Sequence, residues 1–454
     1  MKALIAAAAV LVLLSPLMPL RGDDLIGSGD LERRITLEEL QEHAAGYSPE
    51  LEKLRSAQRQ SRIDLAEARS GRWPEISFLA TGTYLFNPMD EMKAYLPDGS
   101  SFPIMEAQEP TYYQFGLQLT QPIFTWGKIH QAVRLHELLL EVRSLEVYQK
   151  QRELNTTAAT LVHSLCYLEE MLQTVDQQVR LALRLSEITR DSFDQGFIVE
   201  EELLSARLQV RELELLQREL QREKRSLLRQ LEQLTGIQGL SPGIIEYQEI
   251  TFRDLGSETD VIGRALSGDR EIFMILNLLR EVQDRALKIS QASMYWKPDL
   301  ALQIEAGYES SQFPLIEKDW YRQEDYSFNV TVALETTLWD GGRRIQEVKR
   351  SREEVVDADI TLLEARHTIT EEVSETYLQY ELNRSRMEYH DLKGQLFADR
   401  IGSSRRQFES GAGSEPDLLA LQLESLGHDL QTLRTRIDAV RGYLTLLHMT
   451  GEDF

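Results

Sequence analysis

The chain has 454 residues, and 50 Lys and Arg stand against 74 Asp and Glu, for a formal charge of −24. Such an acidic surface repels the phosphate backbone of nucleic acids, so we expect no nucleic-acid partner. The length suffices for two or three ordinary domains. Solvated helix faces explain most of the acidic excess, and the lining of a cation-favouring passage is the alternative.

The first twenty residues have the pattern of a secretory signal peptide. Lys2 is followed by an apolar run that ends at Leu20 and contains Pro16 and Pro19. The prolines argue against the alternative, a continuous membrane-anchoring helix. We therefore expect residues 1–20 to be a signal peptide, and no later run is apolar and long enough for a transmembrane helix.

The rest of the chain consists of two copies of one repeat. Phe193-Asp194-Gln195-Gly196 matches Phe408-Glu409-Ser410-Gly411, and Leu234-Thr235-Gly236 matches Met449-Thr450-Gly451. These pairs share one separation of 215 positions, which chance similarity does not maintain over such a length. The predicted boundaries are 21–236 for the first repeat, 237–257 for the inter-repeat linker and 258–454 for the second repeat.

The predicted elements follow the same order in both repeats. A helical stretch is followed by two strands, a very long helix, a glycine break and a last helix. In the first repeat these elements are 36–70, 74–87, 112–124, 129–194 and 199–235. In the second repeat they are 258–294, 298–310, 326–338, 343–408 and 416–449.

The predicted strands have one apolar and one polar face. Between 326 and 335, aromatic and aliphatic residues occupy every second position. This period of two is typical of a half-buried strand, either in a membrane barrel or in a soluble sandwich. A length of about ten residues and aromatic residues near the strand ends favour the barrel. The polar residues expected to face a watery lumen are Gln114, Gln118, Gln303, Glu305, Asn329 and Thr331.

Four strands cannot close a membrane barrel, because known barrels begin at about eight strands. Open strand edges are not tolerated in lipid. Several chains must therefore share one barrel, and the segments 87–111 and 310–325 would be its outer loops.

The long segments 129–194 and 343–408 contain no proline. As helices they would each reach about 100 Å, and such lengths imply coiled-coil packing. In the last helix, aliphatic residues follow alternating steps of four and three from Leu419 to Leu447. Gly196, Gly411 and Gly413 mark turns between antiparallel helices, at the end of the protein away from the strands.

The signal sequence, the tandem strand–helix repeat and the motif Gly-x-x-x-x-x-(Glu/Asp)-Leu-Leu after each long helix resemble the TolC-like outer membrane efflux protein family. The stretch from Leu338 to Arg343 is similar to that family's strand-to-helix junction. The resemblance covers nearly the whole mature chain.

This resemblance implies a mainly α fold with some β structure. Three subunits would form a homotrimer in outer-membrane lipid, with four strands each in a shared transmembrane β-barrel, on an α-helical coiled-coil barrel in the periplasm. The channel would be the exit duct of a tripartite efflux or type I secretion system. Its partners would be a periplasmic adaptor protein and an inner-membrane pump.

The resemblance also implies a gate at the periplasmic tip. Asp417 falls at the position of a ring carboxylate, and Glu202 falls at a polar gating position. Phe408 and Gly413 replace a gate-locking tyrosine and arginine, and neither can make the corresponding hydrogen bonds. We expect a looser gate, or one held by other pairs. Asp417 is a candidate for a cation-binding constriction, and a helix N-terminal carboxylate beside Ser414 is the equal alternative.

Catalytic and metal sites have little support in the sequence. The single cysteine, Cys166, excludes an intramolecular disulfide and a multi-cysteine metal site. The histidines form no i, i+4 pair, and neither a nucleophile elbow nor a phosphate loop is present. We therefore predict that the protein is not an enzyme and has no cofactor.

The main rival interpretation is a soluble periplasmic coiled-coil scaffold or adaptor. It explains the signal peptide and the helices, but it does not explain four strands with aromatic ends. A passive porin is disfavoured because most of the chain is helical. The cargo, whether drug, metal ion or polypeptide, and the identities of the pump and adaptor do not follow from the sequence.

Overall fold

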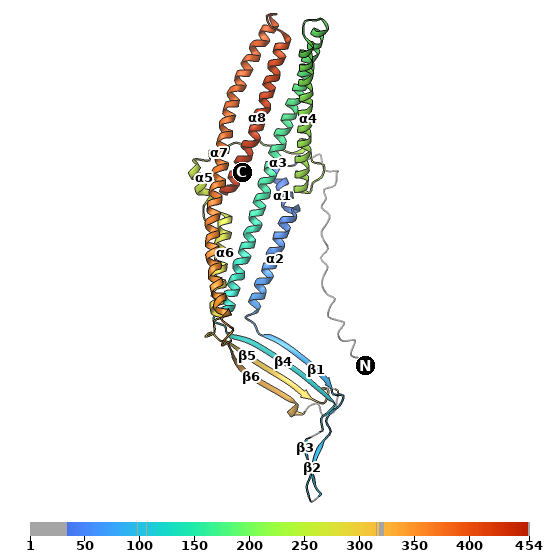
Figure 1. The fold of residues 1–454 in the computed structure, drawn as a ribbon, viewed down its shortest axis with the longest axis vertical. Coiled ribbons are helices and arrows are strands. Elements are labelled where there is room, and N and C mark those ends of the chain that lie inside the picture. The colour runs from blue at the N-terminus through green and yellow to red at the C-terminus, as the bar shows by residue number, and fades with distance from the viewer. Residues whose placement is uncertain (1–33, 98, 106, 315, 317–321, 453–454) are drawn as a thin grey trace.

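The computed structural model describes residues 34–452, except 98, 106, 315 and 317–321. The predicted signal peptide lies outside the described residues. The described chain is long and narrow, with a column of helices at one end and a curved sheet at the other (Figure 1). None of the described helices is long and apolar enough to cross a lipid bilayer.

Four strands form an antiparallel sheet in the order β1–β4–β5–β6. The first repeat supplies β1 (Glu75–Tyr84) and β4 (Thr111–Phe124), and the second supplies β5 (Asp299–Ser310) and β6 (Tyr326–Glu335). The two repeats therefore meet at the β4–β5 ladder. All four strands begin and end within three residues of the positions expected from the alternation.

A smaller hairpin lies in the loop between β1 and β4. Its strands are β2 (Met92–Tyr95) and β3 (Ser101–Met105), and it projects beyond the sheet (Figure 1). The sequence predicted only a surface loop here. The strands are too short, and the prolines and acidic residues around them too frequent, for a period of two to be recognised.

Two helices of 67 residues each run from the sheet to the far end of the column: α3 (Lys128–Asp194) and α7 (Arg343–Glu409). Each begins directly after a glycine in the left-handed region, with φ of 82° at Gly127 and 85° at Gly342. Only glycine adopts this backbone conformation without a steric penalty, and it lets each strand turn sharply into its helix.

The chain returns from the far end through α4 (Glu200–Thr235) and α8 (Glu415–Thr450). The predicted aliphatic seam of α8 is confirmed. Seven residues of the seam are buried, and the remaining two, Leu426 and Ile437, are half-buried. The buried ones are Leu419, Leu423, Leu430, Leu433, Val440, Leu444 and Leu447.

Each of the two helical stretches that precede the strands is divided in two, where the sequence predicted one. The first is α1 (Leu37–Tyr47) and α2 (Pro49–Ser70), and the second is α5 (Glu258–Ala265) and α6 (Glu271–Ala292). Ser48 explains the first break. Its hydroxyl accepts a hydrogen bond from the Leu51 amide at 3.3 Å, and the proline that follows disfavours the helical conformation for Ser48 itself.

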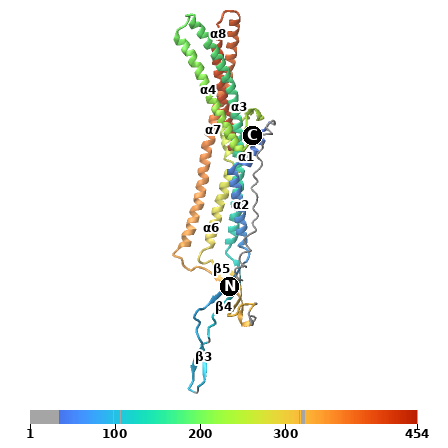
Figure 2. The ribbon, with the colours of Figure 1, turned by 90° about the vertical axis from the view of Figure 1, so that its right-hand side faces the viewer.

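The column is one layer, four helices wide. Near the sheet its order is α2–α3–α6–α7, and nearer the far end it is α4–α3–α8–α7 (Figures 1 and 2). The inter-repeat segment crosses the column where these two sets meet. Its 3-10 turn η1 (Pro242–Ile244) precedes Ile245, which bridges to Ile35, and Leu255 packs in a core with Tyr443 and Leu446. A second 3-10 turn, η2 (Gln323–Asp325), precedes β6.

The glycine that ends α4 is a point where the fold tolerates no side chain. Gly236 has φ of 74°, and a Cβ there would lie 2.5 Å from a ring carbon of Tyr47. We predict that Gly236→Ala lowers the free energy of unfolding by about 2 kcal/mol, because strain and overlap add. Gly46→Ala is the matched control. Gly46 lies in α1 with open space around it, so alanine should stabilise by about 0.5 kcal/mol. Thermal unfolding followed by circular dichroism measures both, and equal effects would contradict this account.

Candidate functional site

The sheet register brings the predicted lumen residues onto one face. Residues that lie directly opposite one another in a ladder point to the same side of a sheet. One such row contains Ser77, Gln118, Glu305 and Asn329. On the same face, Gln303 lies between Thr120 and Thr331 in the next row, and Gln114 pairs with Glu309 further along. All six predicted residues therefore share one polar face: Gln114, Gln118, Gln303, Glu305, Asn329 and Thr331.

The opposite face of the sheet is apolar and exposed. One of its rows contains Phe78, Leu117, Ala306 and Phe328. The side chains of Phe78 and Phe328 are 68% and 70% exposed in the single chain. A contiguous apolar surface of this kind marks contact with a membrane or with another protein.

Aromatic side chains lie at both ends of the sheet. At the end away from the helices, the ring centroids of Tyr113 and Phe115 lie 5.1 and 5.8 Å from that of Phe313. At the helix end, each of the four strand–helix junctions contains an exposed tryptophan: Trp73, Trp126, Trp296 and Trp339. Two such belts are typical of a sheet that crosses a bilayer, because amphipathic rings gather at both interfaces.

The sheet has two free edges. β1 and β6 are its outermost strands, so one side of each presents backbone N–H and C=O groups without a ladder partner among the described residues. In lipid such groups would have no water to bind, and each would cost several kcal/mol. The edges and the apolar face are therefore surfaces available for contact with lipid or with another chain.

The two helix turns lie at the end of the column away from the sheet, as predicted (Figure 1). Gly196 and Gly411 adopt φ of 80° and 76° in the α3–α4 and α7–α8 turns. At Gly413 a Cβ would lie 3.1 Å from the backbone nitrogen of Phe408. The close approach of the backbone gives a local reason why glycine, and no arginine, occupies this position.

Asp417 takes part in the N-terminal cap of α8, which is the alternative role expected for it. The Asp417 amide donates to the Ser414 hydroxyl at 3.3 Å, and that hydroxyl donates to the Asp417 carboxylate. Phe408, 40% exposed, belongs to the same α7–α8 turn, whereas Glu202 is exposed in the first turn of α4. Within one chain, the candidate gate residues are therefore divided between two turns.

A charged contact near the tip was not predicted. Arg184 of α3 donates through Nε to the Glu415 carboxylate at 3.2 Å and so connects α3 with the start of α8. The two residues of this contact are 231 positions apart, and both belong to helix surfaces rich in charge. No local pattern in the sequence could single out this pair.

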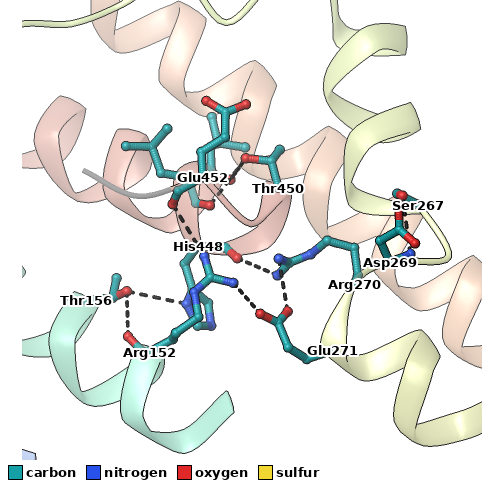
Figure 3. Close-up of polar contacts among 11 residues, drawn as sticks. Arg152, Thr156, Ser267, Asp269, Arg270, Glu271, His448, Thr450 and Glu452 are labelled. Carbon is teal, nitrogen blue, oxygen red and sulfur yellow. Dashed lines mark hydrogen bonds and ion pairs between the residues drawn. The ribbon is translucent and has the colours of Figure 1, made fainter. Parts of the chain in front are cut away.

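A largely buried charged cluster connects the two repeats (Figure 3). We call Arg152, Arg270, Glu271 and His448 the equatorial joint. A guanidinium nitrogen of Arg152 lies 2.7 Å from one oxygen of the Glu271 carboxylate, and one of Arg270 lies 3.0 Å from the other oxygen. Arg270 also donates to the His448 carbonyl at 2.8 Å. The joint thus links α3 of the first repeat with α6 and α8 of the second.

Burial and mutual charge set the protonation states in the joint. Burial opposes ionisation of Glu271, but its own backbone amide and the two arginines outweigh burial, so the pKa of Glu271 is lowered. Burial, assisted by Arg152 and Arg270, lowers the pKa of His448. The joint therefore holds an ionised carboxylate between two arginines, beside a neutral imidazole.

A comparison of the two repeats in the sequence could have pointed to this joint. Helices α2 and α6 both have 22 residues, and the capping Ser48 of the first corresponds to Arg270 of the second. Where the first repeat uses a hydroxyl to cap its helix, the second places a guanidinium. Among the described residues there is no group of three or more His, Cys, Asp or Glu side chains that could hold a metal ion.

The sequence matches the outer membrane efflux protein family over residues 40–237 and 275–452, which is most of the chain. The chain therefore belongs to the outer membrane efflux protein family. The family consists of channel proteins, so this chain is an outer-membrane efflux channel. Comparison with curated protein sequences gives no match.

Solved outer-membrane channels have the same fold. The outer membrane protein VceC from Vibrio cholerae is 17% identical, with a TM-score of 0.74 over 92% of this chain and 96% of that one. The CmeC outer membrane channel of Campylobacter jejuni is 15% identical, with a TM-score of 0.73 over 91% and 85%. The MtrE outer membrane channel of Neisseria gonorrhoeae is 11% identical, with a TM-score of 0.72 over 92% and 89%.

Replacement of Glu271 tests the equatorial joint. Glu271→Gln leaves two largely buried arginines without a counter-charge and should lower the free energy of unfolding by about 3 kcal/mol at pH 7. Because the folded pKa of Glu271 is lowered, its stabilisation is present above the unfolded value of 4.5 and is lost as the pH falls through the folded value. Urea unfolding at pH 7 and pH 4 measures both effects.

The matched control for this prediction is Glu52→Gln. Glu52 forms an ion pair with Arg59 on the exposed surface of α2, with more than half of each side chain exposed, and its loss should leave the urea midpoint unchanged. An equal loss in both variants would show that the joint contributes no more than a surface pair.

Proposed function

We propose that three copies of this chain close one barrel in the outer membrane and one helical tunnel in the periplasm. The observation that carries the proposal is a four-stranded sheet with two free edges, one apolar face and one polar face. Three sheets joined β6 to β1 satisfy every edge, and the apolar face then meets lipid. The six polar residues of the other face would line the lumen: Gln114, Gln118, Gln303, Glu305, Asn329 and Thr331.

The surface of the helices supports the same assembly. In the described column α7 is the outer long helix on one side, and the short helix α5 packs on it near the middle (Figure 1). Its exposed aliphatic residues continue along most of its length: Ile345, Val356, Ile360, Leu363, Leu378, Leu382, Leu392 and Leu396. On the other side, α4 exposes Leu204, Leu208 and Leu215. Burial of these two stripes against each other, α7 of one copy on α4 of the next, would close the column into a tube.

The tube would be the exit duct of a tripartite efflux or type I secretion system. With the sheet in the outer membrane, the helix turns lie about 100 Å away in the periplasm, as 67-residue helices reach. There the tips would receive a periplasmic adaptor and, through it, cargo from an inner-membrane pump. The alternative, a soluble periplasmic scaffold, leaves the free edges and the apolar face without a purpose.

The mass of the particle extracted in detergent tests the assembly. Light scattering should give a trimer from the outer-membrane fraction, and a soluble monomer released with the periplasm would favour the scaffold instead. Leu378→Glu with Leu382→Glu should shift the particle toward monomer, because two charges would enter the apolar contact. Thr361→Glu, at an exposed position of α7 away from this stripe, is the control and should leave the trimer intact.

The tip carboxylate can be tested separately. We propose that Asp417 residues of three subunits form a cation-binding constriction, so divalent cations should block conductance of the wild-type channel in planar bilayers. Asp417→Asn should relieve the block, and Asp399→Asn, an exposed aspartate on α7, should not. If Asp417→Asn leaves the block unchanged and only lowers thermal stability, Asp417 serves as the cap of α8 alone.

A further inference from the structure

The sheet consists of two strand pairs that have the same register. Glu75, the first residue of β1, pairs with Thr120, and Asp299, the first residue of β5, pairs with Glu335. Thr120 and Glu335 are 215 positions apart, which is the separation of the repeats. From these pairs onward, both ladders continue in step to the end of the shorter strand. In the sheet, β1 therefore corresponds to β5, and β4 corresponds to β6.

The contact between the two strand pairs is called the inner seam, and it consists of the β4–β5 ladder and one ion pair. In the ladder, Gln118 lies opposite Glu305. At the helix end, Lys128 Nζ lies 2.6 Å from a carboxylate oxygen of Asp299. Lys128 is the first residue of α3 and Asp299 the first residue of β5, so the ion pair connects the two repeats where the strands meet the helices.

The strand β6 is shorter than its equivalent in the first repeat. β4 has 14 residues and β6 has 10. The last residues of β4, 121–124, lie beyond its ladder with β1, and their only ladder partner is β5. The equivalent residues, 336–339, follow β6 and belong to no strand, and Leu338 and Trp339 are 83% and 75% exposed. β6 thus ends where a strand on its open edge would be needed to continue it.

The open edges carry the two charges that correspond to the ion pair of the inner seam. Glu75 corresponds to Asp299, since each is the first residue of its strand, and Arg343 corresponds to Lys128, since each follows a left-handed glycine. The side chain of Arg343 is 81% exposed, and Asp340 lies 3.9 Å away, at the limit of an ion pair. Glu75 is exposed and forms no ion pair with another described residue.

We propose that β1 of each subunit joins β6 of the next in the register of the inner seam, with an ion pair between Glu75 and Arg343 of the partner subunit. This register rests on the proposed trimer and gives its barrel a defined geometry. It places Thr81 opposite Ala333 of the partner subunit. The segment 336–339 then has a strand partner and extends β6 by four residues, as 121–124 extend β4.

The other register available from the chain is that of the two strand pairs themselves. It would place Glu75 opposite Glu335 of the partner subunit, and like charges directly opposite one another destabilise a ladder. It would also place Thr81 opposite Asn329 of the partner subunit. The two registers differ by four residues, or about 13 Å along the strand, so cross-linking can distinguish them.

Disulfide formation between engineered cysteines tests the register. The native cysteine is removed by Cys166→Ser in the full-length chain. Thr81→Cys with Ala333→Cys should form covalent dimers and trimers when the detergent-extracted particle is oxidised, because opposite residues of an antiparallel ladder lie within disulfide reach. Thr81→Cys with Asn329→Cys is the matched control and should stay monomeric on a denaturing gel without reductant.

Reversal of the charges tests the ion pair. Glu75→Arg alone should speed the exchange of subunits between differently tagged trimers about fivefold, because two cations then meet at each seam. Glu75→Arg with Arg343→Glu should restore the wild-type rate of exchange. Glu75→Arg with Arg350→Glu, which changes an exposed arginine two turns further along α7, is the control and should not restore it.

The outcomes separate the seam from the assembly. A particle with the mass of a trimer that cross-links through position 329, or through neither pair, would overturn the register and leave the trimer intact. Single reversals that exchange as slowly as the wild type, or a double reversal as fast as Glu75→Arg, would overturn the ion pair. A wild-type particle with the mass of a monomer would overturn the assembly, and the seam with it.

Discussion

The hydrogen-bonding demand of the outermost strands determines most of what this molecule can be. A backbone N–H or C=O at the edge of a sheet has to bind water, another strand or nothing, and lipid offers no partner. Both β1 and β6 present such an edge, and the face between them is apolar and exposed. A sheet of this kind leaves two edges and one face open in the described chain, whereas the helices have cores of their own.

The internal repeat provides the geometry that makes closure simple. Because β4 pairs with β5, the two halves are joined inside the chain by a ladder of the same antiparallel type that the proposed trimer would form between chains. The helices show the same repeat, since α3 and α7 start after corresponding glycines and have equal lengths. One repeated unit can thus produce a closed ring with a small number of copies.

The two repeats nevertheless differ at the glycines that end their last helices. The glycine that ends α4 is covered by the ring of Tyr47, whereas the one that ends α8, Gly451, is covered by the guanidinium of Arg270. That same arginine belongs to the equatorial joint. Buried ion pairs gain little net stability over apolar packing, but they penalise any arrangement that separates their partners. The joint therefore favours one placement of the second repeat against α3.

The sequence by itself determined the repeat, the four barrel strands, the length of the helices and the turns at their far end. These features are periodic or local, so each is recorded in neighbouring residues: alternation for β6, steps of four and three for α8, a glycine for each sharp turn. The division of polar and apolar residues between two faces of the sheet also followed, because side-chain direction in a strand alternates with fixed period.

Only the tertiary structure decided how distant segments meet. The contacts of Arg152 with Glu271 and of Arg184 with Glu415 join residues more than a hundred positions apart. In a chain with charges on nearly every helix turn, no local pattern distinguishes such a pair from its solvated neighbours. Only the comparison of the repeats, with Arg270 in place of the capping Ser48, sets the equatorial joint apart. The hairpin β2–β3 and the break at Ser48 were missed because short elements carry too few periods to be recognised. Burial and pairing depend on which surfaces pack together, and packing is a property of the whole fold.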